Sequence, residues 1–490
     1  MRHLRLDTVA PDDVAAALAR LRSELDLPTG FNPDVSAEAE RTAARVAAEL
    51  AGPVPDGVAD LRAMAFVTID PPGSMDLDQA LHLSREDDGY VLHYAIADVG
   101  RLVEPGSALD AETRARATTV YGPDDRIPLH PAVLSEGVGS LLPDVDRFAL
   151  VWQIALDASG KIADATVRRS LVRSRARLTY AEVQEGIDAG EASPLLTAHP
   201  MLALLPVVGG LREERERARG GVSLDVPEQE IEADDDGGLR LAFRSVLPVE
   251  GWNAQLSLAT GIAAAQVMRG GGVGILRTLP PAEDRDVARL RRAAHGLGID
   301  WSRDTTYGEL LEVLDSRVAA HAAFMTEAMS LFRGSGYLAF VEAVEPSDLT
   351  RHAAIAAEYA HVTAPLRRLV DRFGLEICVA LCAGEPVPSW VLDALPELGA
   401  QMASGSQRAS GYERGCLDIV EAAVLRGREG EEFDAVVVDT NGSASSGVVM
   451  LAQPAVRGRV TGAEVPLGED VRVRLVRASV EDRAVEFALV

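Results

Sequence analysis

The sequence predicts a multidomain α+β protein with three parts. The predicted parts are an N-terminal helical module (1–58), a mixed α+β body (59–428) and a C-terminal OB-type β-barrel (429–490). Three observations support this division. Apolar residues recur with a helical period near the start, with a period of two from about residue 62, and with a period of two again over the last ~60 residues.

The N-terminal module is predicted from two amphipathic segments. The first, residues 11–27, carries four apolar residues on one helical face. These are Val14, Leu18, Leu21 and Leu25. The second follows Ser36 and stops at Gly52-Pro53, a pair that ends helices.

The body begins with alternating segments that predict strands. RAMAFVTID (62–70), QALHLSRE (79–86) and YVLHYAIADV (90–99) are separated by the turn sequences PPGSM and DDG. Helical and strand patterns then alternate irregularly to about residue 245, which favours α+β over a regular α/β repeat. Beyond residue 250 the pattern is mostly helical, as far as Gly427.

The C-terminal segment predicts a small barrel. Five short Val-rich stretches, separated by Gly, Asn, Asp or Pro, suit an OB-type fold, which often binds single-stranded nucleic acid. Phe433 and Phe487 are its only aromatic residues, so a base-stacking platform would be poor. A structural or backbone-contacting barrel is the favoured interpretation.

Charge and the start of the chain limit the partners. The formal net charge is −27, which repels a polyanion at long range unless a local basic channel outweighs it. The start, MRHLRLDTVAPDD, lacks the apolar run of a secretion signal, and no segment is long enough to span a membrane. We therefore expect a cytoplasmic protein, without membrane contact and with no obligate protein partner evident.

The segment IDPPGSMDLDQA (69–80) carries the most chemistry. Asp70 ends a strand, Pro71 to Gly73 force a reversal, and Asp76 and Asp78 are two residues apart, so their side chains project to one side. Three neighbouring carboxylates repel one another unless a cation neutralises them, and oxygen ligands favour Mg²⁺, with Mn²⁺ possible. Such a site suits phosphodiester hydrolysis. By spacing alone, an acidic surface turn explains the residues as well.

The same segment resembles the signature of the ribonuclease II family, whose RNB domain has Asp at relative positions 0, 6, 8 and 9. These positions fall here on Asp70, Asp76, Asp78 and Gln79. The similarity continues through IADV (96–99), TTVYGPDDRIPLHPAVLS (118–135) and YAHVTAPLRRLVDR (359–372). The resemblance implies an RNB-like catalytic domain over 59–428. It also implies a hydrolytic 3′-to-5′ exoribonuclease that degrades single-stranded RNA to nucleoside 5′-monophosphates with Mg²⁺.

The resemblance also assigns roles to single residues. Asp70, Asp76, Asp78 and Gln79 become the metal positions, and Asp78 is the one that activity should need most. Arg367 and Glu413 match catalytic residues around the scissile phosphate. The RNA-binding set that follows is Tyr121, Arg367 and Arg368. Tyr121 matches an aromatic residue of the family that stacks near the RNA 3′ end and helps set the length of the final product.

Arg367 has an independent argument from the residues. Thr363 and Pro365 predict a helix start, which puts Arg367 and Arg368 in the first turn, where a bound phosphate would favour them. The alternatives are a surface arginine without a partner and an ion pair to Asp371.

The chain departs from the family pattern in several places. Gln79 replaces the fourth aspartate, so Gln79→Asp is expected to tighten metal binding; Ala95, Ala364 and Leu369 replace a histidine, a serine and a tyrosine. The front also looks too short for the paired cold-shock barrels of larger relatives, and the helical module there could contact RNA or simply cap the fold. The alternative function is therefore a catalytically weak or inactive RNA-binding clamp or regulator of the same fold. A metal phosphoesterase for small molecules is a third possibility.

Overall fold

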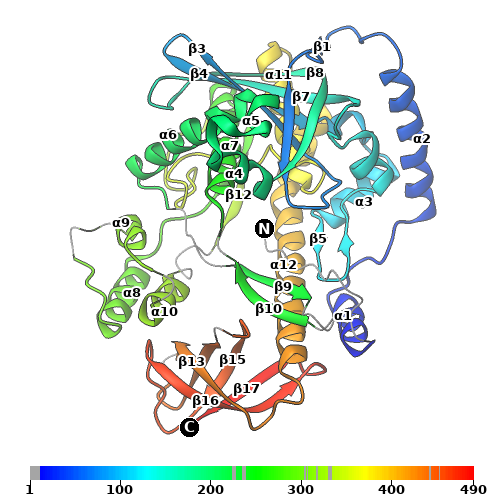
Figure 1. Ribbon diagram of the computed structural model, residues 1–490. Coiled ribbons are helices and arrows are strands. Elements are labelled where there is room, and N and C mark those ends of the chain that lie inside the picture. Colours follow the sequence, from blue (N-terminus) through cyan, green and yellow to red (C-terminus); the bar gives the residue numbers. More distant parts are fainter. Residues whose placement is uncertain are drawn as a thin grey trace.

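The computed structural model describes residues 12–222, 228–233, 239–244, 246–302, 305, 307–315, 318–328, 334–440, 443–451 and 453–490. It confirms the predicted fold class, with N-terminal helices, a mixed α+β body and a five-stranded barrel at the C-terminal end (Figure 1). Within these ranges, no helix is both long and apolar enough to cross a bilayer. Residues 1–11, which entered the prediction of a cytoplasmic protein, lie outside them.

The α-helices in the described part of the chain are α1 Asp12–Glu24, α2 Pro33–Leu50, α3 Ala108–Arg116, α4 Tyr180–Asp188, α5 Pro194–Ala198, α6 Leu205–Ala218, α7 Pro248–Gly271, α8 Asp284–Gly296, α9 Tyr307–Glu312, α10 Ala319–Ala328, α11 Leu369–Ala383 and α12 Ser389–Leu425. The body strands are β1 Ala59–Asp60, β2 Phe66–Asp70, β3 Gln79–Glu86, β4 Gly89–Ala97, β5 Val120–Tyr121, β6 Arg126–Ile127, β7 Asp146–Leu156, β8 Ile162–Thr179, β9 Glu228–Ala233, β10 Leu239–Arg244, β11 Gly274–Thr278 and β12 Gly336–Phe340.

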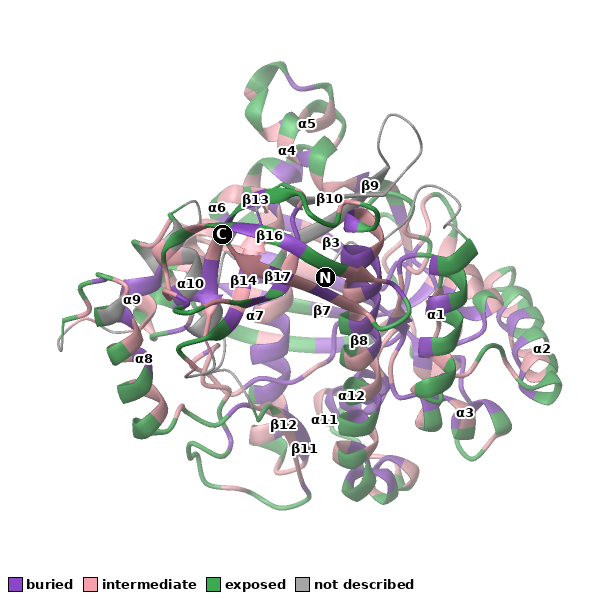
Figure 2. Ribbon diagram, turned by 90° about the horizontal axis from the view of Figure 1, so that it is seen from below, coloured by how far each residue is buried: buried purple, intermediate pink, exposed green. Residues whose placement is uncertain are grey.

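The central sheet has the order β1-β8-β2-β3-β4-β7. The long strand β8 also pairs with β7 from Ile162 to Arg173 and then with β2 from Ser174 to Thr179, so the sheet closes on itself through β8. The main hydrophobic core lies between one face of this sheet and the helices α7 and α11. Figure 2 shows the buried positions of α7 and α12 and the mostly exposed surface of α8.

The five C-terminal strands form a closed barrel in the order β13-β14-β15-β17-β16. The strands are β13 Glu432–Asp439, β14 Ser446–Leu451, β15 Arg457–Thr461, β16 Asp470–Ser479 and β17 Ala484–Leu489. Phe433 and Phe487 lie inside, 7% and 1% exposed, with ring centroids 6.1 Å apart. The barrel therefore exposes neither aromatic ring for base stacking, as the sequence led us to expect.

The two N-terminal helices do not share a core of their own. The apolar stripe of α1 joins the cluster that contains the barrel interior and the C-terminal half of α12. The stripe of α2 (Val35, Ala39, Ala43, Val46) joins a different cluster, around Val99, Leu109 and Leu134. Each helix is therefore built into another part of the fold. The domain boundaries at 58 and 428 stay predictions.

The mostly helical region after residue 250 contains a two-stranded antiparallel sheet that the sequence did not predict. Strands β11 and β12 pair from Gly274↔Phe340 to Thr278↔Gly336, although about 60 residues separate them. Pairing partners so far apart leave no local turn signal, which is why periodicity missed them.

A buried ionic bridge joins the sheet to α11. Arg169 on β8 donates to both oxygens of Asp98 at 2.6 and 2.7 Å, and to both oxygens of Glu376 at 2.6 and 2.7 Å. The side chains of Asp98 and Glu376 are 1% and 8% exposed. Arg169 belongs to a run of five arginines between residues 168 and 177, and its guanidinium balances these two interior carboxylates.

Arg169→Leu is expected to lower the free energy of unfolding by about 3–5 kcal/mol, because it leaves two buried carboxylates without a counter-charge. Denaturant unfolding monitored by circular dichroism measures the change. Arg168→Leu, at the exposed neighbouring position on the same strand, is the control and should change stability by less than about 0.5 kcal/mol. Equal stability of the two variants would show that the bridge contributes nothing.

Candidate active site

A single large cavity of about 1130 Å³ contains most of the predicted site residues. Its wall includes Asp70, Asp76, Asp78, Gln79, Tyr121 and Arg367. These residues come from the β2–β3 connection, from the β5–β6 hairpin and from the segment before α11, so the fold gathers them from three distant parts of the sequence. Glu413 and Arg368 are absent from the described lining of this cavity.

The acidic segment takes its shape from the end of a buried strand. Residues 66–69 of β2 are buried in the centre of the sheet, and Gly73 adopts a positive φ of 77° in the turn that follows. Leu77 is fully buried; its amide donates to Ser140 Oγ at 3.0 Å and its carbonyl accepts from the Leu141 amide at 3.0 Å. With Leu77 fixed against the interior, Asp76 and Asp78 on either side both line the cavity.

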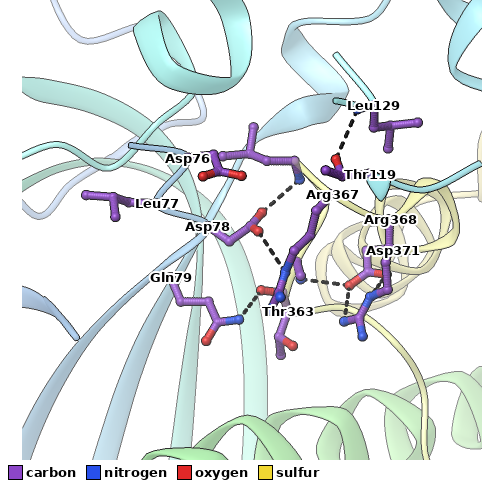
Figure 3. A network of polar contacts seen from close by, with 12 residues as sticks. Asp76, Leu77, Asp78, Gln79, Thr119, Leu129, Thr363, Arg367, Arg368 and Asp371 are labelled. Carbon is purple, nitrogen blue, oxygen red and sulfur yellow. Dashed lines mark hydrogen bonds and ion pairs between the residues drawn. The ribbon is translucent and has the colours of Figure 1, made fainter. Parts of the chain in front are cut away.

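Asp78 is the most deeply buried of the three aspartates in this segment, at 4% exposure. Its Oδ1 accepts a 2.7 Å hydrogen bond from the Leu366 amide, and its Oδ2 lies 3.4 Å from Arg367 Nε (Figure 3). Burial raises the pKa of Asp78 to about 8, although Arg367 and the Leu366 amide oppose the shift. A buried carboxylate with a raised pKa is a frequent mark of a functional site.

The segment that carries Arg367 is a turn, and the predicted helix start at Thr363 and Pro365 is wrong. Helix α11 begins at Leu369, after Arg368 in extended conformation (φ −135°, ψ 126°). The backbone of Arg367 and Leu369 is bound to another chain segment instead: Arg367 O accepts from the Thr119 amide, and the Leu369 amide donates to Ala117 O, both at 2.9 Å. Arg367 therefore gains no helix dipole, and its position follows from this pairing and from Asp78.

Asp70 offers an unsatisfied oxygen to the same cavity. Its Oδ2 is buried and has no hydrogen-bond partner among the described residues. Burial raises the pKa of Asp70 to about 6, against the opposing charge of Arg367. An orphaned buried carboxylate oxygen is costly unless a cation or donor meets it, so the donor chemistry fits a hard cation such as Mg²⁺.

The three carboxylates are nevertheless not arranged as a ready ligand set. Across the described residues, no group of three or more His, Cys, Asp or Glu side chains converges on a metal position. Asp76 instead accepts a 2.6 Å ion-paired hydrogen bond from Arg126, which also contacts Glu136. Arg126 therefore supplies the positive charge that we expected, from the sequence, a metal ion to supply. The sequence offered no signal for this role, because Arg126 is 50 residues from Asp76.

Both polar atoms of the Gln79 side chain are hydrogen-bonded within the protein. Its Nε2 donates to Thr363 O at 2.6 Å (Figure 3). Its Oε1 accepts from the hydroxyl of the buried Tyr94. The expected metal role of Gln79 therefore needs a carbonyl oxygen that the structure uses elsewhere. Gln79 instead ties β3 to the turn that carries Arg367.

The remaining predicted residues are placed as follows. Tyr121 lines the cavity, and burial raises the pKa of its phenol, which keeps the ring neutral. Arg368 donates to both oxygens of the fully buried Asp371, at 3.0 and 2.8 Å, which was the alternative considered for this pair of arginines. Glu413 lies on α12, half-buried. The RNA-binding role of Arg368 and the catalytic role of Glu413 stay predictions without geometric support.

Comparison with known proteins adds family relationships to this geometry. The model of the RNB domain matches residues 58–375, and that of the RNase II-type exonuclease C-terminal S1 domain matches residues 431–490. Ribonuclease R of Vibrio cholerae is 26% identical over 506 residues, which cover 93% of this chain and 59% of that protein. The chain therefore spans about three fifths of the length of this curated relative.

Solved structures share the fold. Ribonuclease R of Mycoplasma genitalium in complex with ribose-methylated single-stranded RNA aligns with a TM-score of 0.84 at 19% identity, covering 98% of this chain and 78% of that chain. Yeast Ssd1, described as a pseudonuclease, aligns with a TM-score of 0.66 at 16% identity, covering 95% and 57%. At these identities the likeness establishes the fold alone.

Both polar atoms of the Gln79 side chain are hydrogen-bonded, so for Gln79→Asp we now expect the opposite of the tighter metal binding that the sequence suggested. A shorter carboxylate cannot donate to Thr363 O, so we expect a loss of about 1–3 kcal/mol in stability and no tighter binding of Mg²⁺ or Mn²⁺. Thermal unfolding and titration calorimetry measure the two effects. Gln153→Asp, at an exposed position on β7, is the matched control. Tighter metal binding with unchanged stability would instead place residue 79 beside the ion.

Proposed function

This chain belongs to the RNB-domain family of ribonuclease II and ribonuclease R, with a C-terminal S1 domain, and from that we propose that it is a 3′-to-5′ exoribonuclease. The proposed reaction is hydrolysis of single-stranded RNA to nucleoside 5′-monophosphates, assisted by a divalent cation. One observation supports it above the others. Arg367 meets the buried Asp78 inside a cavity whose wall also holds the unsatisfied Asp70.

Each of these residues has a definite task in the proposed reaction. The planar guanidinium of Arg367 suits the non-bridging oxygens of a phosphodiester, and its ion pair with Asp78 holds it at the cavity wall. Asp70 and Asp78 would hold Mg²⁺, joined by Asp76 once Arg126 releases it. When bound, such an ion neutralises phosphoryl charge and lowers the pKa of the attacking water.

The neutral ring of Tyr121, which lines the same cavity, offers a stacking surface for a nucleobase. The cavity wall is otherwise mainly acidic, with nine carboxylates against the three arginines Arg126, Arg217 and Arg367. An RNA 3′ end entering such a cavity needs cations to offset the repulsion. This supports the dependence on a divalent ion.

A non-catalytic RNA-binding clamp is the second candidate, and specific observations favour it. Gln79 stands where the family pattern has an aspartate, and Asp76 is paired with Arg126, so two of the four metal positions are engaged by the protein itself. The similarity to yeast Ssd1 shows that this fold also occurs in a protein described as a pseudonuclease.

Asp78→Asn is the decisive variant. It keeps the size of the side chain but removes a carboxylate that could bind the cation beside Arg367, so we expect RNA shortening to slow by roughly a hundredfold or more, the scale of an electrostatic group at a reacting centre. The assay follows unstructured 5′-labelled RNA with Mg²⁺ or Mn²⁺ on sequencing gels. RNA binding in EDTA, measured by fluorescence anisotropy, should persist.

Asp88→Asn, in the exposed β3–β4 turn, is the matched control and should shorten RNA at the wild-type rate. If the wild-type protein binds RNA but never shortens it at any concentration of either metal, the clamp is correct and the nuclease proposal falls.

A further inference from the structure

Helix α1 contacts three parts of the molecule that are far apart in sequence. Its buried stripe, Val14 to Leu21, belongs to the same hydrophobic cluster as Val120 of strand β5, Tyr412 of helix α12 and Phe487 of the barrel. Figure 1 shows α1 beside the lower half of α12, between the β5 hairpin and the barrel. Helix α1 therefore packs against α12, the helix that also contacts strand β5 at the cavity wall and strand β17 of the barrel.

The polar face of α1 adds a direct link to the cavity wall through Arg22. Its Nε donates to the hydroxyl of Tyr412 at 2.8 Å, and its terminal nitrogen forms an ion pair with Asp124. The guanidinium carbon also lies 5.8 Å from the centroid of the Tyr412 ring. Because Tyr412 is fully buried, it can hold Arg22 in a fixed direction.

Asp124 sits at the tip of the β5–β6 hairpin, between Tyr121 and Arg126, and all three line the cavity. The hairpin rests directly on the Tyr412 ring: a Cβ at Gly122 would lie 2.8 Å from Tyr412 Cε1. Arg126, on the second strand of the hairpin, forms an ion pair with Asp76. The position of the hairpin thus sets both the aromatic wall and the counter-charge of an acidic site residue.

Two further ion pairs extend α1 in the other direction. Glu24 lies 2.8 Å from Arg483, in the turn between β16 and β17 of the barrel. Asp13 pairs with Arg426, the residue after the last turn of α12. Such exposed pairs are individually weak, but here they reinforce a shared apolar interface.

We propose that α1 is a clasp that fixes the β5–β6 hairpin at the cavity wall relative to α12 and the barrel, with Arg22 as its positioning residue. Arg22 acts through Asp124 and Tyr412 and does not itself line the cavity. This assigns the N-terminal helix a structural role toward the site, where the sequence left a choice between RNA contact and a cap. The catalytic consequence rests on the proposed nuclease function; the clasp itself does not.

Hydrogen exchange of the full-length protein tests the clasp without any substrate. Arg22→Ala and Asp124→Ala should each speed exchange in residues 120–127 by about tenfold, as expected for the loss of one charge-assisted hydrogen bond. The double variant should be no faster than either single one, because both remove the same contact. Val14→Ala, which trims α1 packing eight residues before Arg22, should speed exchange in residues 120–127 less than Arg22→Ala does. Arg20→Ala, at an exposed position on the same helix, should leave that exchange unchanged.

RNA shortening tests the consequence. Arg22→Ala should lower kcat/KM about three- to tenfold and broaden the length distribution of the final product, because Tyr121 is less firmly held. Val14→Ala should leave that distribution unchanged even if it lowers the unfolding temperature, which separates positioning from a general loss of stability.

Additive effects of Arg22→Ala and Asp124→Ala on exchange, or equal acceleration by Val14→Ala, would overturn the clasp. Unchanged kcat/KM and product length in Arg22→Ala, despite faster exchange, would remove its role in positioning. If the wild-type protein shortens no RNA, the proposed function fails, and the exchange experiment still decides the clasp.

Discussion

The buried contact between Asp78 and the turn at 363–368 is the interaction on which the site depends. It joins two segments 288 residues apart through a hydrogen bond from the Leu366 amide to the Asp78 carboxylate and an ion pair between Asp78 and Arg367. A carboxylate this deeply buried is stable only if its charge is compensated, so Asp78 and Arg367 constrain each other. Around them, the Thr119 amide and Gln79 fix the backbone of the turn. The position of Arg367 in the cavity therefore depends on the contacts that fix this turn.

The same requirement for compensation explains how the chain departs from its family. A carboxylate at position 79 could accept hydrogen bonds but could not donate to Thr363 O at neutral pH, whereas a glutamine does both. Arg126 likewise balances Asp76 from within the protein. Of these two positions, one carries no charge, and at the other a neighbouring arginine supplies the positive charge that a cation would otherwise bring. Under the proposed function, RNA cleavage would require Arg126 to release Asp76 to an ion, whereas RNA binding would not.

Opposite charges also pair on the surface of the barrel. The net charge of −27 does not leave the arginines of β16 free: Arg472 and Arg474 pair with acids of β13, and Arg477 with Asp482 and Glu486. Exposed pairs of this kind are weak and screened by salt, so a phosphate backbone can compete for them. Under the proposed function, the barrel would contact the phosphates of the RNA backbone, since both of its aromatic rings are buried. This agrees with a barrel whose sequence lacked a stacking surface.

The sequence by itself determined the fold class, the barrel, strands β3 and β4 almost to the residue, and the gathering of Asp70, Asp76 and Asp78 on one cavity. These features follow from local periodicity and from a motif of adjacent residues, whose physical causes act over a few positions. Only the tertiary structure decided that Arg367 lies in a turn, that Gln79 and Arg126 hold the site together, and that α1 reaches its wall. Each of these depends on partners tens to hundreds of residues away, which leave no periodic trace in the chain and meet only after the sheet has formed.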